Sequence, residues 1–98
     1  THIGDFVSVG HNAVIHGAVI EDDCLIGMGA TILDNAVVGT GCIVAANALV
    51  LSNQKLEPFS VYAGVPAKRV KDVTPEQREE IIKRTARDYR VYASWYEE

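Results

Sequence analysis

The chain has 98 residues, which is enough for one small domain. Its 48% hydrophobic and 22% charged residues exclude a disordered or fibrous protein. Nine Lys and Arg against thirteen Asp and Glu give a net charge of −4, without the basic excess of a nucleic-acid-binding surface. No apolar run reaches the ~18 residues of a membrane span, and no signal peptide is visible, so we predict no nucleic-acid or membrane partner.

Residues 1–55 repeat with a period of six, which matches neither a helix nor an alternating strand. An Ile or Val anchor opens each hexad, and the fourth residue after it is small or β-branched in eight of nine hexads. The third residue is Gly or Asn in six hexads, and these types tolerate left-handed corners best. The anchors are Ile3, Val9, Ile15, Ile20, Ile26, Ile32, Val38, Val44 and Val50, with one step of five residues after Ile15.

This period predicts a triangular coil of three short parallel strands, with about 18 residues in each turn and ~4.8 Å between turns. Ile3, Ile20 and Val38 should then form one interior column, within three coils over residues 3–55. Sandwich strands are the alternative, but they show an 8–12-residue spacing.

After the repeat, residues 56–73 contain two turn signals, and we expect them to cap the last coil. Residues 74–98 are predicted to form a helix that packs on the prism, with Thr74 as N-cap, Pro75 as the first helical residue and Gln77 completing a capping box. A helix to Tyr96 would be taller than three coils, so its end needs a surface from further coils before Thr1 or from a neighbouring chain. We expect both: a natural chain longer than this one, and a trimer in which the helix lies between subunits.

Three segments together resemble the γ-class carbonic anhydrase-like family: Ile-Gly-Asp-Phe-Val-Ser-Val-Gly-His-Asn-Ala-Val-Ile-His-Gly at 3–17, Leu-Ile-Gly-Met-Gly-Ala at 25–30 and Gly-Val-Pro-Ala-Lys at 64–68. The resemblance covers nearly the whole chain, which looks like the C-terminal part of such a protein. It implies a mainly β fold: a single-stranded, left-handed parallel β-helix of hexapeptide repeats with three visible coils, followed by a C-terminal α-helix. The bare hexad is shared with many acyltransferases.

His11 and His16 are the candidate metal ligands. His11 comes two places after Val9 and His16 one place after Ile15, so both should face outward, on different faces of the coil. One ion at 2.0–2.1 Å from both imidazoles is difficult to reach within one chain, but a second subunit could bring His16 against the His11 of its neighbour. Solvated surface histidines are the alternative.

The family resemblance implies that this arrangement is a homotrimer with a metal ion at each interface, zinc or another divalent transition metal. It implies a third histidine ligand on a preceding coil and the reversible hydration of carbon dioxide to bicarbonate. It also places Tyr89, in a helix segment, near the neighbouring active site.

Glu21, Asp22 and Asp23 follow His16, and we interpret them as a solvated corner, with a proton shuttle as the alternative.

Two other functions fit the repeat: an acyltransferase that uses coenzyme A thioesters, and a non-catalytic scaffold or assembly subunit. Cys24 and Cys42 occupy the same hexad slot and are expected to act as small buried hydrophobes rather than ligands. Reduced thiols without a signal peptide favour a cytoplasmic location.

Overall fold

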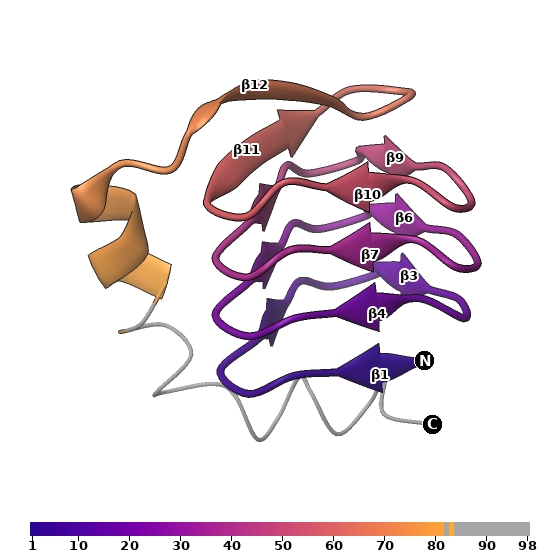
Figure 1. Ribbon diagram of the computed structural model, residues 1–98, viewed down its shortest axis with the longest axis horizontal. Coiled ribbons are helices and arrows are strands. Elements are labelled where there is room, and N and C mark those ends of the chain that lie inside the picture. The colour runs from indigo at the N-terminus through magenta and orange to yellow at the C-terminus, as the bar shows by residue number, and fades with distance from the viewer. Residues whose placement is uncertain (82, 84–98) are drawn as a thin grey trace.

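Residues 1–81 and 83 are described by a computed structural model, in which three parallel sheets form the faces of a triangular prism (Figure 1). Sheet A contains β1 (His2–Ile3), β4 (Val19–Ile20), β7 (Val37–Val38) and β10 (Lys55–Leu56). Sheet B contains β2 (Ser8–Val9), β5 (Leu25–Ile26), β8 (Ile43–Val44), β11 (Ser60–Ala63) and β12 (Lys68–Asp72). Sheet C contains β3 (Val14–Ile15), β6 (Thr31–Ile32) and β9 (Leu49–Val50).

The anchors stack in three interior columns, as the repeat predicts. Ile3 pairs with Ile20 and Ile20 with Val38, and the latter two side chains are fully buried. Ile3 is only partly buried and packs against the edge of this core, because its coil has a described neighbour on one side alone. The predicted parallel β-solenoid of about three turns is therefore confirmed.

The corners are formed by residues in the left-handed backbone region. All six predicted corner residues have a positive φ: Asn12, Gly29, Asn35, Gly41, Asn47 and Asn53. Phe6, Asp23 and Phe59 adopt the same conformation at equivalent corners. Glycine and asparagine are therefore preferred at these corners, but the stacking of the coils forces other residues into the same conformation.

The five-residue step after Ile15 changes which residue points inward. Counting four places from Ile15 predicts Val19 as the interior residue, and this is wrong. Ala18 is 1% exposed and fills the interior slot, whereas Val19 is 38% exposed on sheet A. Since one residue is missing from this corner, the inward position comes one place sooner.

The solenoid extends beyond residue 55. Leu56 pairs with Val38 and Tyr62 with Val44, so the columns continue into the segment in which we expected only capping turns. Strand β12 then folds back antiparallel on β11 and closes the top of the prism (Figure 1). The strands of this segment therefore stay in register with the coils below, although the corner residues no longer follow the Gly and Asn pattern.

A helical segment over 75–81 starts at the predicted capping box. The backbone N–H of Thr74 donates to Oε1 of Gln77 at 2.9 Å, and the N–H of Gln77 donates to Oγ1 of Thr74 at 3.1 Å. Tyr89 and the rest of the predicted helix to Tyr96 lie outside the described residues. Within residues 1–81 and 83, no helix has the length and apolar character needed to cross a membrane.

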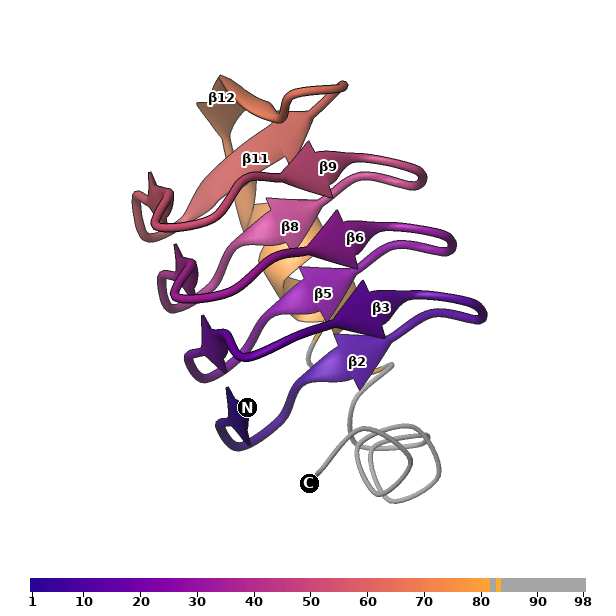
Figure 2. The same cartoon turned by 90° about the vertical axis from the view of Figure 1, so that its right-hand side faces the viewer.

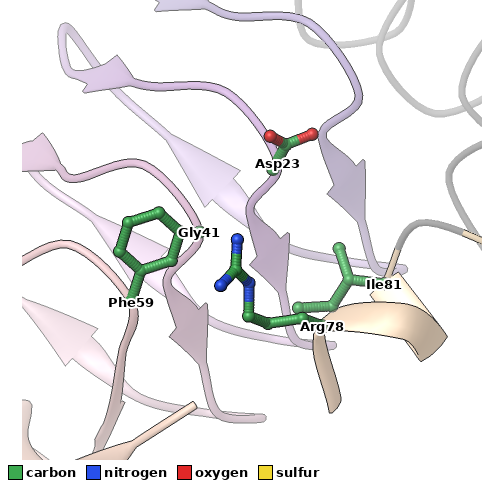
Figure 3. Close-up of a pocket in the computed structure, with 5 residues that line it drawn as sticks. All are labelled: Asp23, Gly41, Phe59, Arg78 and Ile81. Atoms are coloured by element: carbon green, nitrogen blue, oxygen red, sulfur yellow. The ribbon is translucent and has the colours of Figure 1, made fainter. Parts of the chain in front are cut away.

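The first helical turns dock on the corner between sheets A and B. There Asp23, Gly41 and Phe59 lie one above another, and Figure 3 shows Arg78 and Ile81 of the helix beside them. The Arg78 guanidinium is 4.5 Å from the centroid of the Phe59 ring, a cation–π contact. Gly41 is required here because a Cβ at this position would overlap the Phe59 ring.

Neighbouring residues of β4 provide a test of the column register. We expect Ile20→Ala to lower the free energy of unfolding by about 2–5 kcal/mol, because the side chain is fully buried and leaves a cavity. Val19→Ala, on the outer surface of the same strand, should change it by less than about 0.5 kcal/mol. Urea unfolding at equilibrium measures both, and equal losses would contradict the register.

Candidate metal centre

His11 lies at the corner between sheets B and C, in the turn from β2 to β3. Its side chain is exposed, as predicted. The backbone holds it in place, since the carbonyl of His11 accepts the N–H of Gly29 at 3.0 Å from the coil above. The imidazole thus starts from a rigid corner at one edge of sheet C.

His16 lies at the opposite end of β3, at the corner between sheets C and A. Its backbone N–H donates to the carbonyl of Ile32 at 2.9 Å, which continues the ladder of sheet C by one residue. Its ring contacts a carboxylate that the sequence analysis missed: Nδ1 of His16 is 2.6 Å from Oδ1 of Asp34. The side chains of His16 and Asp34 are 75% and 55% exposed.

The shortened corner makes this contact possible. One coil higher, two residues, Asp34 and Asn35, turn the chain, and on the His16 coil Gly17 alone takes their place. A Cβ on Gly17 would lie 2.5 Å from Oδ1 of Asp34, so the carboxylate occupies the space that the glycine leaves. The sequence signal was the five-residue step itself, with an aspartate eighteen residues after the histidine.

The structure does not bring His11 and His16 together within one chain, because strand β3 separates them. Across residues 1–81 and 83, no group of three His, Cys, Asp or Glu side chains is placed to hold a metal ion. Between the two histidines, Val14 of β3 is 50% exposed on sheet C. Two more exposed apolar side chains lie at the corners beside this sheet: Met28, 59% exposed, in the turn before β6, and Leu51, 43% exposed, directly after β9. In Figure 2 this sheet faces the viewer, and the helix lies on the far side of the prism.

The acidic turn after His16 lies at the third corner, between sheets A and B, away from both histidines. Oε1 of Glu21 accepts the Thr40 N–H at 3.1 Å, and Oδ1 of Asp22 accepts the Asp5 N–H at 2.7 Å. These carboxylates bond to the backbone of neighbouring coils, which supports their interpretation as a structural corner rather than a proton shuttle.

The two cysteines are free, buried thiols stacked in the interior. Sγ of Cys24 donates to the carbonyl of Gly39 at 3.2 Å, and Sγ of Cys42 to the carbonyl of Glu57 at 2.8 Å. Burial raises the pKa of the Cys24 thiol to about 12 and also raises the pKa of Cys42. Thiols that remain protonated at neutral pH are poor metal ligands, so the candidate ligands remain the histidines.

The pocket beneath the helix is too small to bind a coenzyme. Asp23, Gly41, Phe59, Arg78 and Ile81 line it, and its volume is about 30 Å³ (Figure 3). Pockets for small molecules usually enclose 300–1,000 Å³. A second, open hollow on sheet A has a volume of about 310 Å³ and is lined by His2, Gly4, Val19, Glu21, Asp22 and Thr40. His11 and His16 line neither pocket and lie at the two edges of sheet C.

The repeats match the family described as bacterial transferase hexapeptide (six repeats), at residues 1–32 and 17–52. Together the two matches cover residues 1–52, which include both histidines. The chain belongs to the hexapeptide-repeat family.

Curated relatives confirm the resemblance to γ-class carbonic anhydrases. A protein of Methanocaldococcus jannaschii named "Probable carbonic anhydrase" is 58% identical over 79% of this chain and 48% of its own length. Gamma carbonic anhydrase 2, mitochondrial, of Arabidopsis thaliana is 46% identical over 79% of this chain and 28% of its own length. The chain thus spans less than half the length of these relatives.

Solved structures show the same solenoid in acyltransferases. A hexapeptide-repeat acetyltransferase of Vibrio cholerae, solved in complex with acetyl coenzyme A, superimposes with a TM-score of 0.68 at 27% identity. The match covers 74% of this chain and 50% of that protein. The fold is therefore shared by proteins named for different chemistries, and the site must distinguish them.

The raised pKa of Cys24 predicts a loss of stability at alkaline pH. The thiol ionises near pH 8.5 in the unfolded chain but at about 12 in the folded one, so above about pH 8.5 ionisation favours unfolding. From about pH 9 to about pH 11, Cys24 should lower the free energy of unfolding by up to about 1.4 kcal/mol per pH unit.

Guanidinium unfolding curves at several pH values measure this slope, with Cys24→Ala as the matched variant because alanine fills the same slot in neighbouring hexads. The variant should show a shallower decline. The same decline in both proteins would show that Cys24 is not buried as described.

Proposed function

We propose that this protein is a γ-carbonic anhydrase-like enzyme, in which a metal ion, zinc or another divalent transition metal, lies between subunits of a homotrimer. His16 of one subunit and the His11 of its neighbour would bind the ion. The observation that carries the proposal is their placement at the two edges of sheet C, with the exposed Val14 between them, on a face that a neighbouring subunit could cover. The names of the relatives support the reaction, the reversible hydration of carbon dioxide.

The donor set fits zinc. Imidazole nitrogen is a preferred zinc ligand, and catalytic zinc sites use three protein ligands with one open position. His11 and His16 supply two such nitrogens, and the family resemblance implies a third histidine on a preceding coil. When bound by histidines, zinc lowers the pKa of water to about 7, which provides the nucleophile for carbon dioxide.

The chain's own residues have two tasks in this proposal. His11 and His16 bind and orient the ion, each from a corner held by backbone hydrogen bonds to the next coil. Val14 and Leu51 would pack against the neighbouring subunit and exclude bulk water from the interface, which strengthens electrostatic interactions there. Tyr89 remains a proposed residue near the active site.

An acyltransferase is the second candidate, supported by the Vibrio cholerae structure with its bound acetyl coenzyme A. It is less favoured because, over residues 1–56, the strands of successive sheets are joined by short corners, and no long loop with a catalytic histidine interrupts the coils.

We also propose a reducing compartment such as the cytoplasm, on the basis of the free thiols of Cys24 and Cys42.

Metal content of the purified protein tests the proposal. For a chain with the preceding coils, we expect a trimeric mass by light scattering, about one zinc per chain by elemental analysis, and carbon dioxide hydration in a stopped-flow assay. For these 98 residues alone we expect weak or absent metal, because two histidine ligands seldom suffice. His16→Ala and His11→Ala should each remove the bound zinc and the activity, because each deletes one ligand from every interface.

His2→Ala is the matched control, since His2 is an exposed histidine that lies on sheet A, away from the face of sheet C. It should retain metal and activity. Full zinc occupancy in His16→Ala would refute the ligand role, and coenzyme A binding without metal would establish the acyltransferase instead.

A further inference from the structure

We propose that Asp34 is a positioning residue that holds the His16 imidazole in the tautomer with its proton on Nδ1, so that Nε2 is the atom presented to a metal ion. The metal part of this inference rests on the proposed function, whereas the tautomer does not. No comparison assigns a role to Asp34, and the sequence analysis did not identify it.

Hydrogen-bond chemistry determines the direction of the bond. An ionised carboxylate can only accept, so in the contact of 2.6 Å between Oδ1 of Asp34 and Nδ1 of His16 the ring nitrogen must donate. A neutral imidazole carries one proton, and a proton on Nδ1 leaves the lone pair on Nε2.

The two ring nitrogens are 1,3-related, so the bond to Asp34 also orients the ring. Nδ1 points toward the Asp34 carboxylate on the coil above, and Nε2 therefore points away from that carboxylate. A carboxylate behind a metal-binding histidine is a recurrent arrangement that fixes the tautomer and raises the basicity of the ligand. Here it exists within a single chain, before any subunit or ion binds.

The corner is built to allow this contact. Asp34 has no counterpart on the shorter coil below, and its side chain lies over Gly17. Gly17 is constrained twice, by a φ of +64° and by the 2.5 Å that would separate its Cβ from Oδ1 of Asp34. Any side chain at this position would displace the carboxylate from the imidazole.

Stability alone does not explain the pair. Both side chains are more than half exposed, and an exposed pair of this kind stabilises a protein little because water competes for the same groups. Removing Asp34 should therefore leave the fold intact. The bond instead determines which ring nitrogen of His16 is unprotonated and in which direction that nitrogen points.

Nitrogen NMR of histidine-labelled, metal-free protein at alkaline pH measures the tautomer directly. The signals of His16, assigned with His2→Gln and His11→Gln, should show a protonated Nδ1 and an unprotonated Nε2. In Asp34→Ala and in Gly17→Ala they should shift toward the tautomer mixture of a solvated histidine. Asp22→Ala is the matched control, because Asp22 also reaches across coils but bonds to the backbone of Asp5.

Cobalt(II) titration, followed by absorbance, tests the consequence for metal binding. We expect Asp34→Ala to weaken cobalt binding about 10–100-fold and Asp22→Ala to leave it unchanged. A His16 with its proton on Nε2 in the unmodified protein would overturn the inference, as would equal cobalt affinities in Asp34→Ala and Asp22→Ala. If His16→Ala leaves cobalt affinity unchanged, it is the proposed function that fails, whatever the tautomer of His16.

Discussion

Hydrogen bonds between successive coils determine the position of every residue in this prism. Strands β1 to β10 have only two residues each, too few to be stable alone, so each depends on its pairing with the neighbouring coils. The N–H of Leu25, for example, donates to the carbonyl of Cys42 at 2.9 Å, and that of Glu21 to the carbonyl of Val38 at 2.9 Å. Because side chains alternate in and out, a slip of one residue would turn the buried anchors to solvent.

The segment between Ile15 and Val19 is one residue shorter than its equivalent on the next coil. The pairing between coils is nevertheless kept, because the shortening falls within a corner. Sheet C keeps Ile15 against Ile32, and sheet A keeps Val19 against Val37, so the strands on both sides of the corner stay in register. The shortening is confined to the turn, where it leaves space beside His16 for the Asp34 carboxylate. The same irregularity therefore places Ala18 inside and gives the candidate ligand its partner.

Much of this fold could be predicted because the residues that determine it recur with a short period along the sequence. The anchors, the six Gly and Asn corners and the capping box of Thr74 and Gln77 each depend on residues a few places apart. Asp34 was missed because its contact depends on side-chain direction at an irregular corner, which the period does not describe. The continuation at Leu56 and Tyr62 was missed because these anchors are neither Ile nor Val and the corner between them is formed by Phe59 instead of Gly or Asn. The ligand roles of His11 and His16 remain predictions, since they depend on contacts between subunits.

In the proposed function, His16 and His11 act together across an interface rather than within a chain. Refolding a mixture of His11→Ala and His16→Ala subunits tests it most directly, with zinc content and carbon dioxide hydration measured before and after mixing. Each variant alone should lack both, whereas mixed trimers contain an interface in which an intact His16 meets an intact His11. Mixing should therefore restore part of the zinc and of the activity. A mixture that assembles into trimers but recovers neither would contradict it.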